Sequence, residues 1–567
     1  MVVVGAGLAG LVCAVRASRR GLRVLVFEAR DRLGGRCWTR EYPGLQQTKV
    51  EMGGEWVDLS VHDGMVEECK HYGIPLVRPE HKSAWNFQFP GRKVISRCEV
   101  PSTEQREWDR VIRQVNQDLS RLNFKLGYDM EELEYYDVPF RDYVRNHLKC
   151  EPTSFMHDYL LAEGFKVTGT DCDKFSALHF LHDLTGFGSL EERCNTKPRS
   201  GDPFRKRDLA RLGGGGTSAL CEAMATEIVS LGGEVRLRAP VASLVCEAVS
   251  ADPPLRWCAI CAVYSHQNCS LHGPRVVVSD GMGNLHRARA VVVAVPINCL
   301  PCLKFSPPLP HSLAHTAEVG NIGEAVKTWA IGSEVALDVD EVLSWPGVVH
   351  SYVKNRGVAV TVASNTSTSS AANIFSSSGI AGDEADGGER PQSSSSSSGS
   401  GSGRSNSRSG TPSRSRSSVE SGPGIVLAVQ GLKESMPDFS LSEAEYAQQL
   451  QPMLRKTHHP TIALNRVLSF DWKSDRWAKG AGLVLRAGAG RLHATAQAEA
   501  VRPWPHTRNL FVAGSDLVVG WTGWMEGAVQ SGLQAYANIE AFAYPPLKEG
   551  RWYRKIDAET DTRRGAK

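Results

Sequence analysis

Glycines at fixed spacing, followed by an acidic residue, are the first group of residues with a recognisable chemical use. Gly5, Gly7 and Gly10 come directly after the apolar run of residues 2–4, and Glu28 ends a second apolar run. The order predicts strand, glycine turn, helix, strand and acid, the arrangement of a dinucleotide-binding βαβ unit. In such a unit Gly5 allows the tight turn, Gly7 lets the backbone approach a pyrophosphate, and Gly10 lets the helix pack on the strand. Glu28 is placed to accept a hydrogen bond from a ribose hydroxyl.

Two more glycines lie between arginines just beyond Glu28. The segment that begins at Arg30 reads RDRLGGR and contains Gly34, Gly35 and Arg36. It resembles the GRxGGR segment of the FAD-binding superfamily that contains amine oxidases, carotene desaturases and protoporphyrinogen oxidases. The resemblance implies that the dinucleotide is FAD rather than NAD. A guanidinium can hold two phosphate oxygens at once, so we expect Arg36 to contact the pyrophosphate, with Arg30 also at the cofactor.

Two further segments resemble parts of the same proteins. Gly53 and Gly54 follow a short apolar stretch and precede Glu55 and Trp56. Paired glycines would let the backbone pass close to a flat ligand. The segment resembles the amine-oxidase segment that lies under the isoalloxazine ring, and Val241, in a short predicted strand, matches a residue whose backbone contacts the adenine side in that family.

A third cofactor segment lies near the C-terminus, where an apolar strand ends at Gly514, Ser515 and Asp516. A glycine-aromatic turn follows and leads into a helix that we expect to start near Met525. The turn consists of Trp521, Thr522, Gly523 and Trp524. Helix N–H groups at this point would face a polar edge of a ligand. The stretch resembles the AGxE and WxGxMEGA motifs of the same proteins, which implies contact with the ribityl chain and pyrimidine end of the flavin.

Lys327 is the residue that we expect to do chemistry. It interrupts a strand of otherwise apolar character, although a single lysine in a sequence is usually a solvated charge. Its position resembles that of the lysine of flavin amine oxidases, which holds a water near flavin N5. With the three cofactor segments, the chain resembles the flavin-containing amine oxidase family. The resemblance implies hydride transfer from the carbon that bears an amine to flavin N5, hydrolysis of the imine, and reduction of dioxygen to hydrogen peroxide.

Some positions depart from the family pattern. Aligning Trp472 with the family's tryptophan puts Ala481 where monoamine oxidases have the cysteine that bonds the flavin, so we expect non-covalent FAD. The next position, often tyrosine, is Gly482, and Trp524 replaces the other tyrosine of the usual aromatic cage. Trp521 and Trp524 are the aromatic residues expected at the reaction centre, and a rebuilt cage that includes Trp477 is an alternative. L-Amino-acid oxidases commonly place an arginine after the strand-glycine turn, whereas Glu55 here suits a cationic substrate.

The resemblance implies an α/β fold, with a Rossmann-like FAD-binding domain assembled from three chain segments beside a second α+β substrate-binding domain. The fully apolar run 290–296 is expected as a buried strand of the first domain, and an aromatic-rich helical lobe over residues 103–184 is expected to cover the substrate. The predicted domains are residues 1–80, 208–296 and 480–545 for FAD, 81–207 and 297–479 for the substrate, a disordered Ser/Gly/Arg-rich insertion at 365–423, and a charged tail at 546–567.

Composition limits the classes of function. The chain has 567 residues, 41% hydrophobic and 22% charged, with a net charge of +3, which is ordinary for a globular protein and gives no reason to expect nucleic-acid binding. Fourteen scattered cysteines indicate a reducing compartment. Without an apolar run of membrane-spanning length or a visible targeting signal, we expect a cytoplasmic or other soluble intracellular protein. The expected partners are an amine and dioxygen, and the oligomeric state is not indicated.

Other interpretations remain open at this point. Cys258, Cys261, His266, Cys269 and His272 lie close together, but no spacing fits a standard zinc finger, so no metal site is predicted. Another flavoprotein, similar to carotene desaturases, protoporphyrinogen oxidases or L-amino-acid oxidases, is the alternative enzyme. A non-catalytic flavin-fold scaffold that recruits partners through the Ser/Arg segment is the alternative outside enzymes.

Overall fold

The computed structural model describes most of the folded part of the chain. The described residues are 1–41, 49–78, 86–88, 95–96, 102–122, 134–152, 154–190, 208–247, 275–319, 321–324, 326–333, 341–344, 349–358, 424–431, 436–456, 461–503, 507 and 509–543. The cysteine-histidine group at 258–272, the Ser/Gly/Arg-rich segment and the charged tail lie outside them. Among the described helices, none combines the length and the apolar character needed to cross a membrane.

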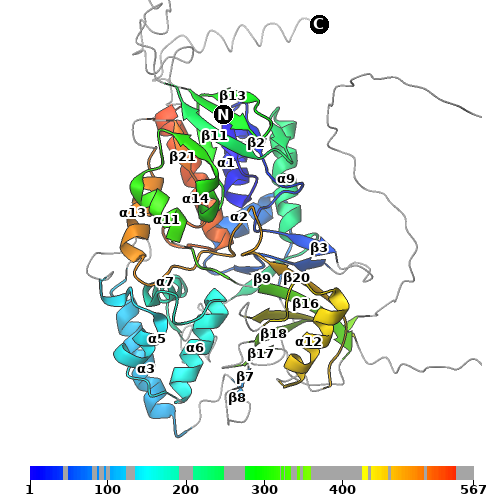
Figure 1. Ribbon diagram of the computed structural model, residues 1–567, viewed down its shortest axis with the longest axis vertical. Helices are drawn as coiled ribbons and strands as arrows, with labels where there is room; N and C mark the ends of the chain where they lie inside the picture. Colours follow the sequence, from blue (N-terminus) through cyan, green and yellow to red (C-terminus); the bar gives the residue numbers. More distant parts are fainter. Residues whose placement is uncertain are drawn as a thin grey trace, which may run out of the picture.

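A parallel sheet occupies the upper half of the molecule (Figure 1) and is built from three separated parts of the chain. In order across the sheet, the strands are β10 (Glu234–Arg236), β2 (Leu25–Phe27), β1 (Val2–Val4), β14 (Val291–Val293) and β21 (Leu510–Val512). Every neighbouring pair is parallel. Parallel sheets are covered on both faces, and the sequence shows why, since all three valines of β1 are buried.

Helices cover one face of this sheet, and a smaller four-stranded sheet with antiparallel and parallel pairs covers the other. Val3, Val26 and Val292 pack toward the helices, whereas Val2 and Val291 pack toward the second sheet. The helices are α1 (Leu8–Arg19), α2 (Asp63–His71), α9 (Gly216–Ser230) and α14 (Met525–Asn538). The second sheet contains β13 (Leu285–Ala288), β12 (Val276–Asp280), β11 (Val241–Cys246) and β15 (Lys304–Ser306). The predicted start of a helix at Met525 is confirmed.

Short strands connect this body to the rest of the molecule. They are β3 (Thr39–Glu41) with β4 (Lys49–Glu51), and β5 (Trp56–Asp58) with β9 (Leu209–Leu212) and β6 (Leu76–Val77). The segment around Gly53 and Gly54 therefore lies between β4 and β5. The apolar run expected as a strand over residues 290–296 is a strand only at its centre, because its last residues turn into the cavity described below.

A mixed sheet lies at the lower right of Figure 1, with α12 (Glu443–Lys456) against it. Its described strands are, in order, β20 (Ala463–Asp471), β16 (Val326–Ser333), β19 (Gly424–Gly431), β18 (Val349–Val358), β17 (Glu341–Ser344), β7 (Asn86–Gln88) and β8 (Ile95–Ser96). Lys327 lies in β16, between β19 and β20.

The described part of residues 103–184 is helical, as predicted, and forms a lobe at the lower left of Figure 1. Its helices are α3 (Gln105–Leu119), α5 (Phe140–Asp142), a π-helical turn (Tyr143–His147), α6 (Phe155–Thr168) and α7 (Ala177–Phe187). Its aromatic residues form a core of their own, with Phe140, Phe165 and Phe180 fully buried. The remaining helices are a 3₁₀ turn (Ile297–Cys302), α11 (His311–Val319), α13 (Gly490–Ala500) and a π-helical turn (Ile539–Ala543).

Candidate functional site

A large cavity of about 1240 Å³ begins at the carboxyl ends of the parallel strands. Ligands of open α/β sheets bind at this edge. The residues directly after β1, β2 and β14 line the cavity, as do Gly514 and Ser515 just beyond β21. Most of the predicted cofactor residues line it too: Gly5, Gly7, Glu28, Arg30, Gly34, Gly35, Arg36, Gly53, Gly54, Glu55, Trp56, Val241, Trp472, Gly514, Ser515, Thr522, Gly523, Trp524 and Met525.

The N-terminus of α1 opens into this cavity. Gly7 is the N-cap, has extended backbone geometry with φ −75°, and makes no side-chain cap, so the first N–H groups of the helix are available to a ligand. A Cβ added to Gly7 would meet no atom within 4 Å, which means that this face is open space. A Cβ added to Gly10 would instead overlap the carbonyl oxygen of Gly5. The two glycines therefore act differently: Gly7 leaves room for a ligand, and Gly10 allows helix packing.

Glu28 is buried at the end of β2. Its Oε2 accepts a hydrogen bond from Ala6 N at 2.8 Å, and its Oε1 accepts one from Arg30 N at 2.9 Å. A carboxylate has about four acceptor sites. Glu28 can therefore accept these two backbone hydrogen bonds and still accept one from a hydroxyl group of a ligand. Arg30 forms an ion pair with Asp475.

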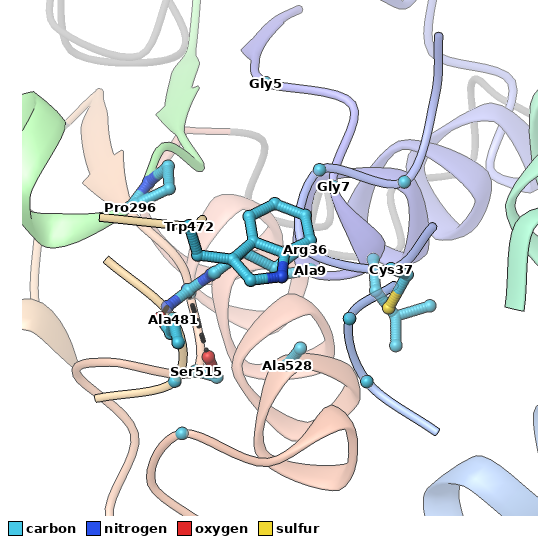
Figure 2. A pocket seen from close by; sticks show the side chains of 18 of the residues that line it. Gly5, Gly7, Ala9, Arg36, Cys37, Pro296, Trp472, Ala481, Ser515 and Ala528 are labelled. Atoms are coloured by element: carbon cyan, nitrogen blue, oxygen red, sulfur yellow. Dashed lines mark hydrogen bonds between the residues drawn. The ribbon is translucent and has the colours of Figure 1, made fainter. Parts of the chain in front are cut away.

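Arg36 crosses the cavity wall toward the C-terminal cofactor segment (Figure 2). Its two terminal nitrogens bind the carboxylate of Asp516 at 2.7 and 3.0 Å, and they also donate to Ala481 O at 3.0 Å and Ser515 Oγ at 3.2 Å. Asp516 Oδ2 also accepts from Ile297 N at 3.0 Å. The guanidinium therefore binds a protein carboxylate in addition to lining the cavity, and its contact with a pyrophosphate stays a prediction. Asp516, predicted as a cofactor contact, is buried and lies outside the cavity lining.

The end of the cavity near Glu28 has further possible contacts for a nucleoside. Val241 lines it together with the preceding Pro240. Trp477 lines the cavity as well, with the Arg476 guanidinium 4.2 Å from its ring centre. Trp477 N donates to Asp475, which pairs with Arg30, so the loop of Trp477 is held beside Arg30. A place for Trp477 in an aromatic cage stays a prediction.

Trp524 lines the opposite end of the cavity. Its Nε1 donates to Asp183 Oδ1 of α7 at 2.7 Å. Trp521, predicted beside it at the reaction centre, is buried outside the cavity lining. Its ring packs edge-on against His62 and Phe187, with ring centres 4.4 and 5.0 Å apart. Trp521 therefore supports the wall that Trp524 presents.

The helical lobe contributes polar groups that the sequence analysis did not single out. His179, Asp183, Lys166 and Thr168 line the cavity from α7 and α6. Burial lowers the pKa of His179 to about 4, so this imidazole is neutral at neutral pH. His179 and Asp183 could have been found from the sequence, because two polar residues four apart in an apolar helical segment lie on one face of the helix.

Lys327 also lines the cavity, and its Nζ lies 2.5 Å from Glu55 Oε2 and 3.3 Å from Gly53 O. The Glu55 side chain is 1% exposed, and its Oε1 lies 2.9 Å from Arg211 Nε. Sequence analysis assigned the Glu55 charge to a cationic substrate. In the structure the Glu55 carboxylate lies between two cations of the protein, Arg211 in β9 and Lys327 in β16.

Trp472 and Met525 complete the wall around the glycines. Trp472 donates from Nε1 to Met52 O at 2.8 Å. A Cβ added to Gly54 would lie 2.9 Å from the Met525 sulfur, so the glycine is required for this close approach. Ala481 and Gly482 line the cavity beside Arg36.

The cavity fits a flavin dinucleotide. It is larger than the roughly 300–1,000 Å³ typical of small-molecule sites, and so has room for a dinucleotide and a small substrate. Two helix N-termini without side-chain caps, at Gly7 and Trp524, reach it. Glu28 lines the cavity from the end of β2 in the parallel sheet, and Lys327 lines it from β16 of the mixed sheet. The order of their contacts along a cofactor stays a prediction.

Comparisons with known proteins identify the family. The family model of flavin containing amine oxidoreductases matches residues 8–539. The chain is 25% identical over 331 residues to (S)-6-hydroxynicotine oxidase of Paenarthrobacter nicotinovorans, covering 58% of this chain and 67% of that protein. It is 24% identical over 555 residues to pseudooxynicotine dehydrogenase of a Pseudomonas species, covering 95% and 86%. A solved structure of putrescine oxidase bound to putrescine has a TM-score of 0.64 at 18% identity, covering 95% of this chain and 98% of that one, and so shows the same fold. The chain therefore belongs to the flavin containing amine oxidoreductases, an FAD-dependent family.

Proposed function

We propose that the protein is an amine oxidase that oxidatively deaminates a primary or secondary amine, with dioxygen as the electron acceptor. The observation that carries this proposal is one cavity with two ends. One end is a glycine-lined cradle at the start of α1, and the other presents the partly buried Lys327 ammonium and the Trp524 ring. FAD, when bound, accepts a hydride from the carbon that bears the amine and passes the electrons to dioxygen, which leaves as hydrogen peroxide.

The cradle residues supply binding in this proposal. The N–H groups behind Gly7 face the pyrophosphate, Glu28 accepts from the ribose, and the 53–54 and 523–525 segments border the ring system. Gly7, Glu28 and residues 53–54 belong to the chain segment that begins with β1 and β2, and residues 523–525 follow β21.

The other end of the cavity supplies the reaction environment. The Trp524 ring, fixed by Asp183, forms an apolar wall, and a water-poor wall favours the neutral amine that can be oxidised. Lys327 supplies a hydrogen-bond donor and a positive charge at Nζ, where a water bound to it could move a proton.

We further propose that FAD is held non-covalently. Ala481 and Gly482 stand at the cavity wall beside Arg36, and neither offers a nucleophilic side chain. Acid denaturation should therefore release all FAD into the supernatant. Flavin fluorescence that stays with the denatured polypeptide would contradict this attachment.

Anaerobic mixing of the yellow protein with amines tests the proposed activity. The panel contains primary amines, secondary amines, diamines and L-amino acids, with a matched alcohol as control. We expect bleaching of the oxidised flavin bands by at least one amine and recovery of the bands, with stoichiometric peroxide, when air is admitted. If an amine bleaches the flavin and the bands do not recover in air, the protein is a dehydrogenase rather than an oxidase. If none of the four amine classes bleaches the flavin, the proposed activity is wrong.

A further inference from the structure

We propose that Glu55 is a positioning residue, whose carboxylate fixes the ammonium of Lys327 at the cavity wall. This inference rests on the proposed function, because it gives Glu55 a role in the same site. It extends that function, because the position of the Lys327 ammonium is then set by three ion-paired side chains, those of Lys327, Glu55 and Arg211. We call them the triad.

The triad joins three segments that are far apart in the sequence. Glu55 directly precedes β5, Arg211 lies in β9, and Lys327 lies in β16 of the mixed sheet. Glu55 Oε2 lies 2.5 Å from Lys327 Nζ, and Oε1 lies 2.9 Å from Arg211 Nε. The carboxylate thus uses one oxygen for each cation, and it cannot turn fully toward one without leaving the other.

Packing holds the triad in place. The Arg211 guanidinium lies 4.2 Å from the ring centre of Trp56, its direct partner across β5 and β9. The side chains of Arg211 and Lys327 are 12% and 16% exposed, and that of Glu55 is 1% exposed. A lysine side chain has a flexible four-carbon stem, so the position of its ammonium depends on its partners. Here those partners are Glu55 and the carbonyl oxygen of Gly53.

The substitution Glu55→Gln would remove the negative charge that pairs with both cations and keep the size and shape of the side chain. Its amide has one acceptor oxygen, and its NH₂ group can only donate. With the side chain in the same place, its oxygen would face either Lys327 or Arg211, and its NH₂ group, a donor, would face the other cation. Aspartate keeps the charge and shortens the side chain by one methylene, so Glu55→Asp is the milder variant.

A double-mutant cycle separates a role through Lys327 from general damage. We expect Glu55→Gln to slow flavin reduction by amine about 10- to 100-fold, because a misplacement of about 1 Å can cost that much. In a Lys327→Met background the same change should alter the rate by less than about threefold, because the group that it positions is gone. Equal slowing in both backgrounds would overturn the proposal.

A second readout needs no turnover. Acetic anhydride labelling of the resting protein, mapped by peptide mass spectrometry, reports how readily the Lys327 amine is reached. We expect Lys327 to be acylated at least threefold faster in Glu55→Gln than in the unmodified protein. Lys166 is the internal reference, because it lines the same cavity and lies 3.6 Å from its own partner Glu163; its labelling should not change.

The matched control is Glu68→Gln. Glu68 is also a buried carboxylate in an ion pair, with Arg16, and it lies outside the cavity lining. Its variant should leave flavin reduction and Lys327 labelling unchanged. If Glu55→Gln does not fold, Glu55→Asp enters the same cycle and the same labelling experiment. Unchanged Lys327 labelling in the folded variant would overturn the proposal, whereas failure of every amine to reduce the unmodified protein would overturn the proposed function and leave the labelling test intact.

Discussion

The two ends of the cavity are built in different ways. The end around Gly7 is made of backbone: its shape comes from glycines and from a helix start without a side-chain cap. The end around Lys327 is made of side chains, many of them buried and charged, that arrive from separate elements. The first end is steric and local, so a change that only fills its open space should act on cofactor binding alone. The second end is a set of coupled contacts, so changes there should spread to their partners.

The largest expected effect comes from filling the backbone end. Gly7→Val places a side chain in open space that we assign to the pyrophosphate, while the extended φ of −75° suits valine without strain. We expect a folded protein that has lost its FAD and its yellow colour. The ratio of flavin absorbance to protein absorbance measures this directly.

Gly10→Val sharpens the same contrast. A side chain at Gly10 would overlap the backbone of Gly5, so this variant should lose the fold itself and show no cooperative unfolding transition. If Gly7→Val keeps stoichiometric FAD, or if Gly10→Val is as stable as the unmodified protein, the distinction between the two glycines is wrong.

A smaller effect is expected at the side-chain end, as a dependence of stability on pH. Burial lowers the pKa of His182 to about 4, against about 6.5 in the unfolded chain. Between these two pKa values the unfolded state binds a proton at His182 and the folded state does not. The free energy of unfolding therefore decreases as the pH falls from 6.5 toward 4. His182→Gln should remove about 2 kcal/mol of the loss in unfolding free energy between pH 7 and pH 5.

Urea unfolding of both proteins at the two pH values measures this difference. The matched control is His71→Gln, because the His71 side chain is 52% exposed and so is not a buried imidazole. The His71 variant should keep most of the unmodified protein's pH dependence. An unchanged pH dependence in His182→Gln would contradict a neutral buried imidazole in α7.

The difference between the two ends also explains what could be predicted from the sequence. Gly5, Gly7, Gly10 and Glu28 lie within one short stretch, and their spacing encodes strand, turn and helix directly. The parallel sheet, the start of α14 and the helical lobe follow from similar local patterns. Family membership followed because these patterns recur in order along the chain, and the comparisons confirm it.

Contacts between distant segments could not be predicted in this way. Glu55 meets Arg211 and Lys327 only because three strands from different parts of the chain converge. The same reason applies to Trp521, which neighbours Trp524 in sequence but packs behind it. It also applies to Asp183, which reaches Trp524 from the helical lobe. Side-chain partners over such separations depend on the assembled fold rather than on local spacing.

Stopped-flow kinetics of Lys327→Met test the central assignment most directly. Methionine is similar in length to lysine and uncharged, so folding and FAD binding should persist. We expect flavin reduction by amine, reoxidation by dioxygen, or both, to slow by about two to four powers of ten, which is typical for the loss of one positioned charge or proton relay. Unchanged rates in both half-reactions, with FAD bound stoichiometrically, would remove Lys327 from the reaction and contradict the proposed site.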